Sequence, residues 1–268
     1  RSSDLTPFAN RSENAFSPRA SLVHEINSHV SWSASMYRAF RAPTLNELYR
    51  PFRQGIVLTE ANSALDAERL TGGNAGVEAN GWNHRVEFRG IFFFNEIIDP
   101  IANVTLSQTS SLITRQRQNM GRTTAPGFEF DATTHITSSF QISGGYQYVA
   151  ANVNSFPANP ALVGLRVAQV PRNTLTFQAR YTNPSRINFT VSGRMVGLQY
   201  DDDKNQSPLG RFFVLGAMAS RGISHGVEIF AAAENLLNAE YATAATPVPQ
   251  LGLPITARFG LRFQFPWR

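Results

Sequence analysis

The sequence VSWSASMYRAFRAPTLNELY, residues 30–49, changes character halfway along its length. In the expected strand 30–38, apolar side chains at positions 30, 32, 34 and 36 alternate with serines at 31, 33 and 35, which is the period of a β-strand with two different faces. Pro43 ends the alternation, because proline has no N–H to donate to a strand ladder and fixes its own φ. From there to about Leu65 the sequence has no clear period. The stretch therefore predicts a two-faced strand that leads into a long, structured loop.

The same alternation recurs along the chain. In residues 83–98 one face carries apolar side chains and the other carries charges: Val86, Phe88, Phe92 and Phe94 against Arg85, Glu87 and Arg89. Successive charged residues indicate that one face of the strand contacts water, and the phenylalanines indicate that the other face lies in an apolar environment. The sequence predicts eleven strands, at residues 17–26, 30–38, 67–79, 83–98, 112–136, 140–149, 173–181, 187–198, 211–223, 227–235 and 255–265. We interpret residues 112–136 as one bent strand, with two strands as the alternative.

The connections between these strands alternate in length. Short turns are expected near residues 27–29, 80–82, 137–139, 183–186 and 224–226. Long loops are expected at residues 39–66, 99–111, 150–168, 199–210 and 236–254. In antiparallel strands this order places every long loop at one end and every tight turn at the other. Transmembrane β-barrels have this arrangement, whereas a soluble sandwich has no reason to sort its loops in this way.

The composition favours a membrane barrel over a soluble β-protein. Hydrophobic residues make up 42% and charged residues 16% of the 268 residues, and no run of 18 apolar residues could form a transmembrane helix. Most expected strands exceed the mode of about 5–6 residues found in soluble sheets. Aromatic residues lie towards strand ends, as in interfacial girdles, at Trp32, Tyr146, Tyr148, Tyr181 and Phe265. Because an all-antiparallel closed barrel needs an even number of strands, we expect these eleven to be part of a larger barrel.

Other features of the sequence narrow the function further. The chain has no cysteine, which excludes disulfides, thiol catalysis and cysteine-based metal sites. Its net charge of +5 is scattered over the strands and forms no patch, which disfavours nucleic-acid binding. The chain opens without an initiator methionine or an apolar signal segment, so we expect it to start inside a longer polypeptide.

Five segments, in order, resemble TonB-dependent outer-membrane receptors. They are FRAPTLNELY (40–49), LDAERLTGGNAGVE (65–78), NMGRTTAPGFEFD (119–131), AENLLNAEY (233–241) and the alternating strand that ends in FQF (263–265). The resemblance implies an all-β fold in which residues 1–268 supply about 11 antiparallel strands, the C-terminal half of a 22-stranded transmembrane β-barrel. The family's plug domain and TonB box have no counterpart in the sequence. The end also departs from the family pattern, because Pro266, Trp267 and Arg268 follow Phe265.

For function, the resemblance implies active uptake of a scarce small molecule, such as an iron chelate, cobalamin or a carbohydrate. The barrel would lie in the lipid of the bacterial outer membrane, with the long loops extracellular and the tight turns and C-terminus periplasmic. Energy would come from the TonB complex through the missing N-terminal region. The alternatives are a passive porin or adhesin-type β-barrel, and a secreted soluble β-protein.

No catalytic or metal-binding constellation is expected, and no cofactor. The histidines, His24, His29, His84, His135 and His225, lack metal-ligand spacing. Asp201, Asp202 and Asp203 could supply carboxylate oxygens to Ca²⁺, but a solvated acidic loop is the simpler interpretation.

The ligand-binding candidates come from the stretch that opens this subsection. Arg41, Glu47 and Tyr49 are expected to fold the loop over the rim of the barrel, with ligand contact as the second interpretation. If a ligand binds, we expect contacts from the tips of the long loops and from upper lumen positions, including Arg38 and Tyr49.

Overall fold

The computed structural model describes residues 10–83, 85–183, 185–224 and 226–263. Expectations about His84, Pro184, His225, Phe265 and residues 266–268 lie outside the described residues. Among the described residues, no helix is long and apolar enough to cross a membrane.

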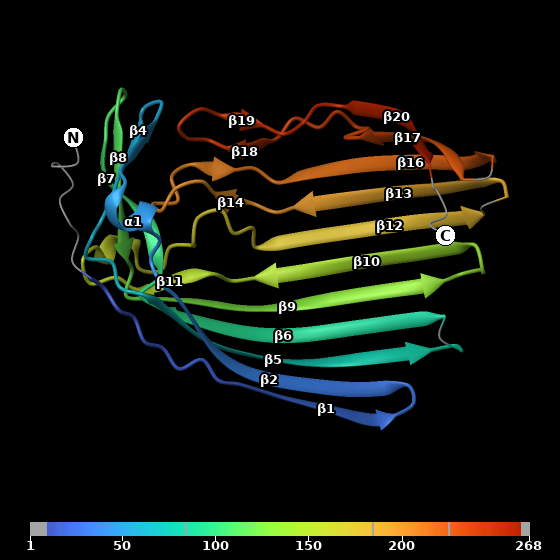
Figure 1. The fold of residues 1–268 in the computed structure, drawn as a ribbon, viewed down its shortest axis with the longest axis horizontal. Coiled ribbons are helices and arrows are strands. Elements are labelled where there is room, and N and C mark those ends of the chain that lie inside the picture. The colour runs from blue at the N-terminus through green and yellow to red at the C-terminus, as the bar shows by residue number, and fades with distance from the viewer. Residues whose placement is uncertain (1–9, 84, 184, 225, 264–268) are drawn as a thin grey trace.

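One antiparallel sheet forms most of the molecule, and its eleven long strands lie side by side in chain order (Figure 1). We call them the wall. They are β1 (Arg19–Asn27), β2 (Val30–Arg41), β5 (Glu68–Gly81), β6 (Val86–Ile98), β9 (Arg122–His135), β10 (Phe140–Val149), β12 (Asn173–Asn183), β13 (Ile187–Val196), β16 (Phe212–Ser224), β17 (Val227–Glu234) and β20 (Thr256–Phe263). β1 and β20 are unpaired with each other, so the described residues do not close the wall into a barrel. The predicted all-β fold of about eleven antiparallel strands is confirmed.

The connections are sorted by length as the sequence predicted. Figure 1 shows the tight turns at one end of the wall and the long connections at the other. The long connections contain short elements of their own: α1 (Leu45–Tyr49), β3 (Phe52–Gln54), β4 (Val57–Glu60), β7 (Ile101–Gln108), β8 (Ile113–Asn119), β11 (Asn152–Ser155), the 3-10 helix η1 (Pro160–Leu162), β14 (Gln199–Tyr200), β15 (Pro208–Leu209), β18 (Ala242–Ala244) and β19 (Gln250–Leu251). These loops are therefore folded.

The single bent strand expected at residues 112–136 is wrong, because the structure has the alternative of two strands. β8 ends at Asn119 and β9 begins at Arg122. At Gly121, between them, a side chain would lie 3.0–3.2 Å from Ser155 and Pro157. β9 belongs to the wall, whereas β8 pairs antiparallel with β7 and parallel with β4 in a separate four-stranded sheet with β3.

The register traces two different faces across the wall, because directly opposed residues of antiparallel strands point to the same side. One row is largely apolar and runs through Trp32, Val77, Gly90, Phe130, Tyr146, Leu175, Met195 and Phe213. The adjacent row is polar and runs through Ser31, Glu78, Arg89, Asp131, Gly145, Thr176 and Arg194. The wall thus has an apolar face and a polar face, as the alternation predicted. Phenylalanines of the apolar face are exposed, Phe92 by 57%.

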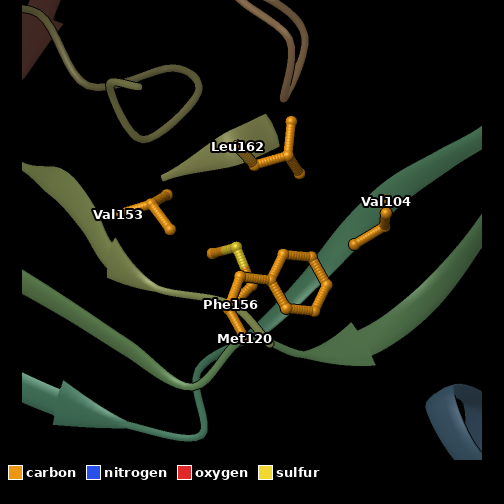
Figure 2. Packing of buried hydrophobic residues seen from close by; sticks show 5 residues of the cluster. All are labelled: Val104, Met120, Val153, Phe156 and Leu162. Atoms are coloured by element: carbon orange, nitrogen blue, oxygen red, sulfur yellow. The ribbon is translucent and has the colours of Figure 1, made fainter. Parts of the chain in front are cut away.

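The buried apolar side chains gather at the loop end of the molecule. Figure 2 shows five of them, from β7, β11, η1 and the adjoining loops: Val104, Met120, Val153, Phe156 and Leu162. Others nearby come from α1, β4 and β15, namely Leu48, Val57 and Leu209. We call the connections that hold this core the loop cap, which comprises residues 42–67, 99–121, 150–172, 197–211 and 235–255.

Candidate ligand-binding face and loop cap

Arg41, at the end of β2, ties the first long loop to the wall. Its Nε and Nη2 donate to Oε2 and Oε1 of Glu68 at 2.6 and 2.9 Å, and Glu68 lies directly opposite on β5. Its Nη1 donates to both carboxylate oxygens of Glu47 in α1, at 3.0 and 3.2 Å. One guanidinium therefore joins β2, β5 and α1.

Glu47 also closes the start of α1. Its Oε2 accepts a hydrogen bond from the Thr44 backbone N–H at 2.7 Å, and the Glu47 N–H donates to Thr44 Oγ1 at 3.3 Å, which makes a capping box. Burial of the carboxyl opposes its ionisation, but the hydrogen bonds from Thr44 and Arg41 outweigh this effect and lower the pKa of Glu47. The folding role predicted for Arg41 and Glu47 is thus supported by their contacts.

Arg38 lies at the rim, as expected, but on the other face of the wall. It is opposite Thr71 and shares a side with Met36, whereas Tyr37 points to the polar side and donates to Asn95 Oδ1 at 2.8 Å. The expected lumen position of Arg38 is wrong, because the alternation continues without a bulge to Arg41. Tyr49 is half-buried in the last turn of α1. Ligand contact by these four candidates stays a prediction.

The polar face of the wall carries a continuous set of hydrogen-bonding groups. Arg89 Nε lies 3.3 Å from Glu78 Oε1 in an ion pair between neighbouring strands. Further along the row, a hollow of about 720 Å³ includes Asp131, Thr176 and Arg194 in its lining. A Cβ at Gly145 would lie only 2.6 Å from Asp131 Oδ1, so the glycine leaves room for the Asp131 carboxylate. This face can therefore form hydrogen bonds with water and with a polar solute.

The acidic stretch 201–203 joins three other loops, so the interpretation as a solvated loop is wrong. Asp201 and Asp202 are buried, at 6% and 9% exposure. Asp201 accepts hydrogen bonds from the Thr246 N–H and hydroxyl at 2.8 and 2.7 Å, and from Gln169 at 3.1 Å. Asp203 accepts from the N–H and hydroxyl of Thr105 at 3.0 and 2.7 Å.

These hydrogen bonds leave every carboxylate oxygen of the stretch with a donor from the protein. Asp202 accepts from the backbone N–H groups of Gln206 and Ser207, which closes its own loop. Burial opposes ionisation of Asp201, but the donors Thr246 and Gln169 outweigh it and lower the pKa of Asp201. The charges of this stretch therefore hold the loop cap together.

Sequence reasoning missed the arginines of the loop cap. Arg115 and Arg117 lie on β8, where residues 114–118 read TRQRQ and are polar on both faces. A strand of the wall needs one apolar face, and a strand that is polar on both faces does not fit there. The polar pattern of residues 114–118 could therefore have indicated that this segment lies outside the wall. Among the described residues, neither arginine has a carboxylate within ion-pair distance. The same part of the chain holds no group of three or more histidines and carboxylates placed to bind a metal ion.

Solved structures with the same fold include several receptors for iron chelates. The siderophore receptor PiuA from Acinetobacter baumannii superposes with a TM-score of 0.72 and 16% identity over 91% of this chain and 35% of that chain. The ferric-catecholate import receptor Fiu from Escherichia coli K12 gives 0.70 and 14%, over 92% and 34%. The ferric yersiniabactin uptake receptor FyuA from Yersinia pestis gives 0.71 and 16%, over 92% and 37%. This chain thus spans about a third of the length of these receptors.

A search of curated proteins finds no match. At these low identities the solved structures establish the fold alone, and sequence similarity comes from the family comparison. The family described as "TonB dependent receptor-like, beta-barrel" matches residues 1–236, which is most of the chain and includes the wall from β1 to β17. Its members are receptors and transporters of the bacterial outer membrane. This chain belongs to the TonB-dependent receptor β-barrel family.

Proposed function

We propose that this chain is the C-terminal part of the barrel of an outer-membrane receptor, and that the whole receptor takes up a scarce metal chelate with energy delivered through TonB. The observation that carries the proposal is the family match over residues 1–236 of a wall with one apolar and one polar face. The plug and the TonB box would lie in a part of the receptor outside residues 1–268. The wall would be half of a 22-stranded barrel.

The two faces support this placement in a membrane. Lipid offers no hydrogen-bond partners, so a spanning sheet needs all its backbone groups paired and an apolar outer surface. The exposed phenylalanines of the apolar face, such as Phe92 and Phe130, meet the second need. The unpaired edges of β1 and β20 would meet the remaining strands of the full barrel. The long loops would be extracellular and the tight turns periplasmic, as is usual for such barrels.

An iron chelate is the ligand class favoured by the structural relatives. PiuA is a siderophore receptor, Fiu is a ferric-catecholate import receptor and FyuA is a ferric yersiniabactin uptake receptor. Another protein with this fold, OprC, is a copper transporter, so iron is not the only metal transported by proteins of this architecture. The polar face and the loop cap would contact the ligand. Arg41 and Glu47 would hold the first loop over the entrance, and Tyr49 would contribute at its rim.

The test is uptake by the full-length receptor in its bacterial host. We expect deletion of its gene to abolish accumulation of at least one radiolabelled ferric chelate under iron limitation, and complementation to restore it. Deletion of TonB should abolish the same uptake although the receptor still binds the chelate at the cell surface.

A passive porin gives a different result in the same experiment. Its uptake would persist without TonB and would scale linearly with chelate concentration. Either behaviour would refute the proposal of energised transport, as would unchanged uptake of every metal chelate in the deletion strain.

A further inference from the structure

A hollow of about 530 Å³ lies at the turn end of the wall, between the β5–β6 turn and the last residues of β9 (Figure 1). Its lining includes Arg85 and His135 together with the apolar side chains of Val86 and Ile136. Among the described residues, no carboxylate lines it. The charge of this part of the lining is therefore positive or neutral, which favours an anion.

The Arg85 guanidinium is exposed and, within the described part of the chain, has no carboxylate at ion-pair distance. The next acidic residue along β6, Glu87, lies opposite Asn80 and Thr133, so it points to the polar face of the wall. Glu87 lines a different hollow on that face. An anion beside Arg85 would thus meet a guanidinium without a competing carboxylate.

Trp82 lies in the same lining and is 81% exposed. Trp82 and Asn83 have φ angles of 49° and 56°, in the left-handed region that a bulky side chain rarely adopts. The Arg85 N–H donates to the Trp82 carbonyl at 3.2 Å, which fixes the turn. The turn therefore presents a large aromatic ring with little to pack against among the described residues. Tryptophan rings are enriched where hydrocarbon meets water.

An apolar track leads from the hollow along the apolar face of the wall. Phe88 follows Val86 on the same face of β6, and its ring stacks on Phe130 of β9 with 6.0 Å between the centroids. Phe88 and Phe130 are 41% and 45% exposed. Gly90 lies directly opposite Phe130, where a Cβ would come within 3.3 Å of that ring. The track can therefore take an acyl chain.

We propose that this hollow binds the headgroup of an anionic glycerophospholipid, with Arg85 donating to the phosphate and Trp82 packing on the glycerol region. One acyl chain would follow Phe88 and Phe130. A guanidinium fork matches phosphate oxygens, and a zwitterionic lipid would bring a second cation close to Arg85. The inference rests on the proposed function only for the placement of the apolar face in lipid.

The experiment measures quenching of Trp82 fluorescence by brominated lipids, with the full-length receptor in phosphatidylcholine vesicles. A minor fraction of the lipid is brominated phosphatidylglycerol, which is anionic, or brominated phosphatidylcholine, which is zwitterionic. Subtraction of the signal of Trp82→Phe isolates the contribution of Trp82. We expect stronger quenching by the phosphatidylglycerol, which corresponds to about a tenfold preference of the site.

Arg85→Gln should remove this preference, because it removes the charge-assisted hydrogen bonds to the phosphate. Arg186→Gln is the matched control, since Arg186 is an exposed arginine in another tight turn and does not line the hollow. Heat-dependent migration in gels checks that each variant is folded. The salt dependence of the wild type needs no variant, and raising NaCl should weaken the preference.

Three results would overturn the inference. The first is equal quenching by the two lipids in the wild type, and the second is an unchanged preference in Arg85→Gln. The third is an equal loss of preference in Arg85→Gln and Arg186→Gln, which would show a diffuse effect of charge at the turn end.

The proposed function can fail independently of this site. A receptor that selects phosphatidylglycerol through Arg85 but takes up no metal chelate would keep the lipid site and remove the function. TonB-dependent uptake by a receptor whose quenching ignores Arg85 would remove the site alone. A full-length receptor that does not insert into vesicles would remove both.

Discussion

The wall and the loop cap are stabilised in different ways. The wall has continuous backbone ladders from β1 to β20, yet large apolar side chains such as Phe92 and Phe130 remain exposed on it. The loop cap contains short elements, but it holds the buried core around Phe156 and the hydrogen bonds of Asp201 and Asp203. The apolar side chains of the wall therefore need an apolar environment outside the described residues, whereas the loop cap has a buried core of its own.

The largest effect is expected from a cavity in the loop cap. Phe156 is 2% exposed in the cluster of Figure 2, so Phe156→Ala should destabilise the loop cap locally by about 3–5 kcal/mol. Hydrogen exchange in the full-length receptor should show faster exchange at β7, β11 and η1. Phe16→Ala is the control, because Phe16 is 81% exposed.

This variant separates the two regions. Because the wall is held by its own ladders, its heat-dependent gel migration should be unchanged in Phe156→Ala. Equal loss of wall and loop-cap protection would show that the two regions unfold as one unit.

The next effect tests the environment of the wall. Phe92 and Ile91 are neighbours in β6 that point to opposite faces, Phe92 beside Phe128 and Ile91 beside Glu129. Phe92→Arg would place a charge in the hydrocarbon region and should cost about 2–4 kcal/mol of barrel stability. Ile91→Arg faces water and a carboxylate and should cost much less. Folded fractions after refolding into lipid vesicles measure both.

If Phe92→Arg and Ile91→Arg are equally stable in vesicles, the assignment of the apolar face to lipid is wrong. If Ile91→Arg is the more damaging variant, the two faces are assigned the wrong way round.

The smallest effect concerns the junction of wall and loop cap at Glu47. The pKa of Glu47 is lowered on folding, so its stabilising contribution is complete above the unfolded pKa of about 4.3. That contribution disappears as the pH falls through the lowered folded pKa. The protection of α1 against hydrogen exchange, measured relative to the intrinsic rate at each pH, should therefore decrease in the wild type as the pH falls through this range.

Glu47→Gln should lower the free energy of local unfolding of α1 by about 1 kcal/mol or less at neutral pH. It should also remove the pH dependence of that free energy. Thr44 and Arg41 remain in this variant, so only the charge of residue 47 changes. The same pH profile in Glu47→Gln and the wild type would rule out this carboxylate as the titrating group.

Much of the wall could be predicted from the sequence, because a period of two is a local property of the chain. The alternation also placed Arg38 on the side of Met36, although we expected it to face the lumen. By contrast, nothing local shows that Arg41 meets Glu68, which lies beyond a long loop. Two strands over residues 112–136 were only our second interpretation, because both halves have the pattern of extended chain.

The sequence by itself determined the number of long strands in the wall, its two faces and the sorting of loops, since each follows from side-chain alternation and the lengths between alternating segments. Only the tertiary structure decided what the loops do. Asp201 meets Thr246, and Asp203 meets Thr105, across many residues of chain. The strand register brings these loops to the same end of the wall, and burial there makes each hydrogen bond between them important for stability.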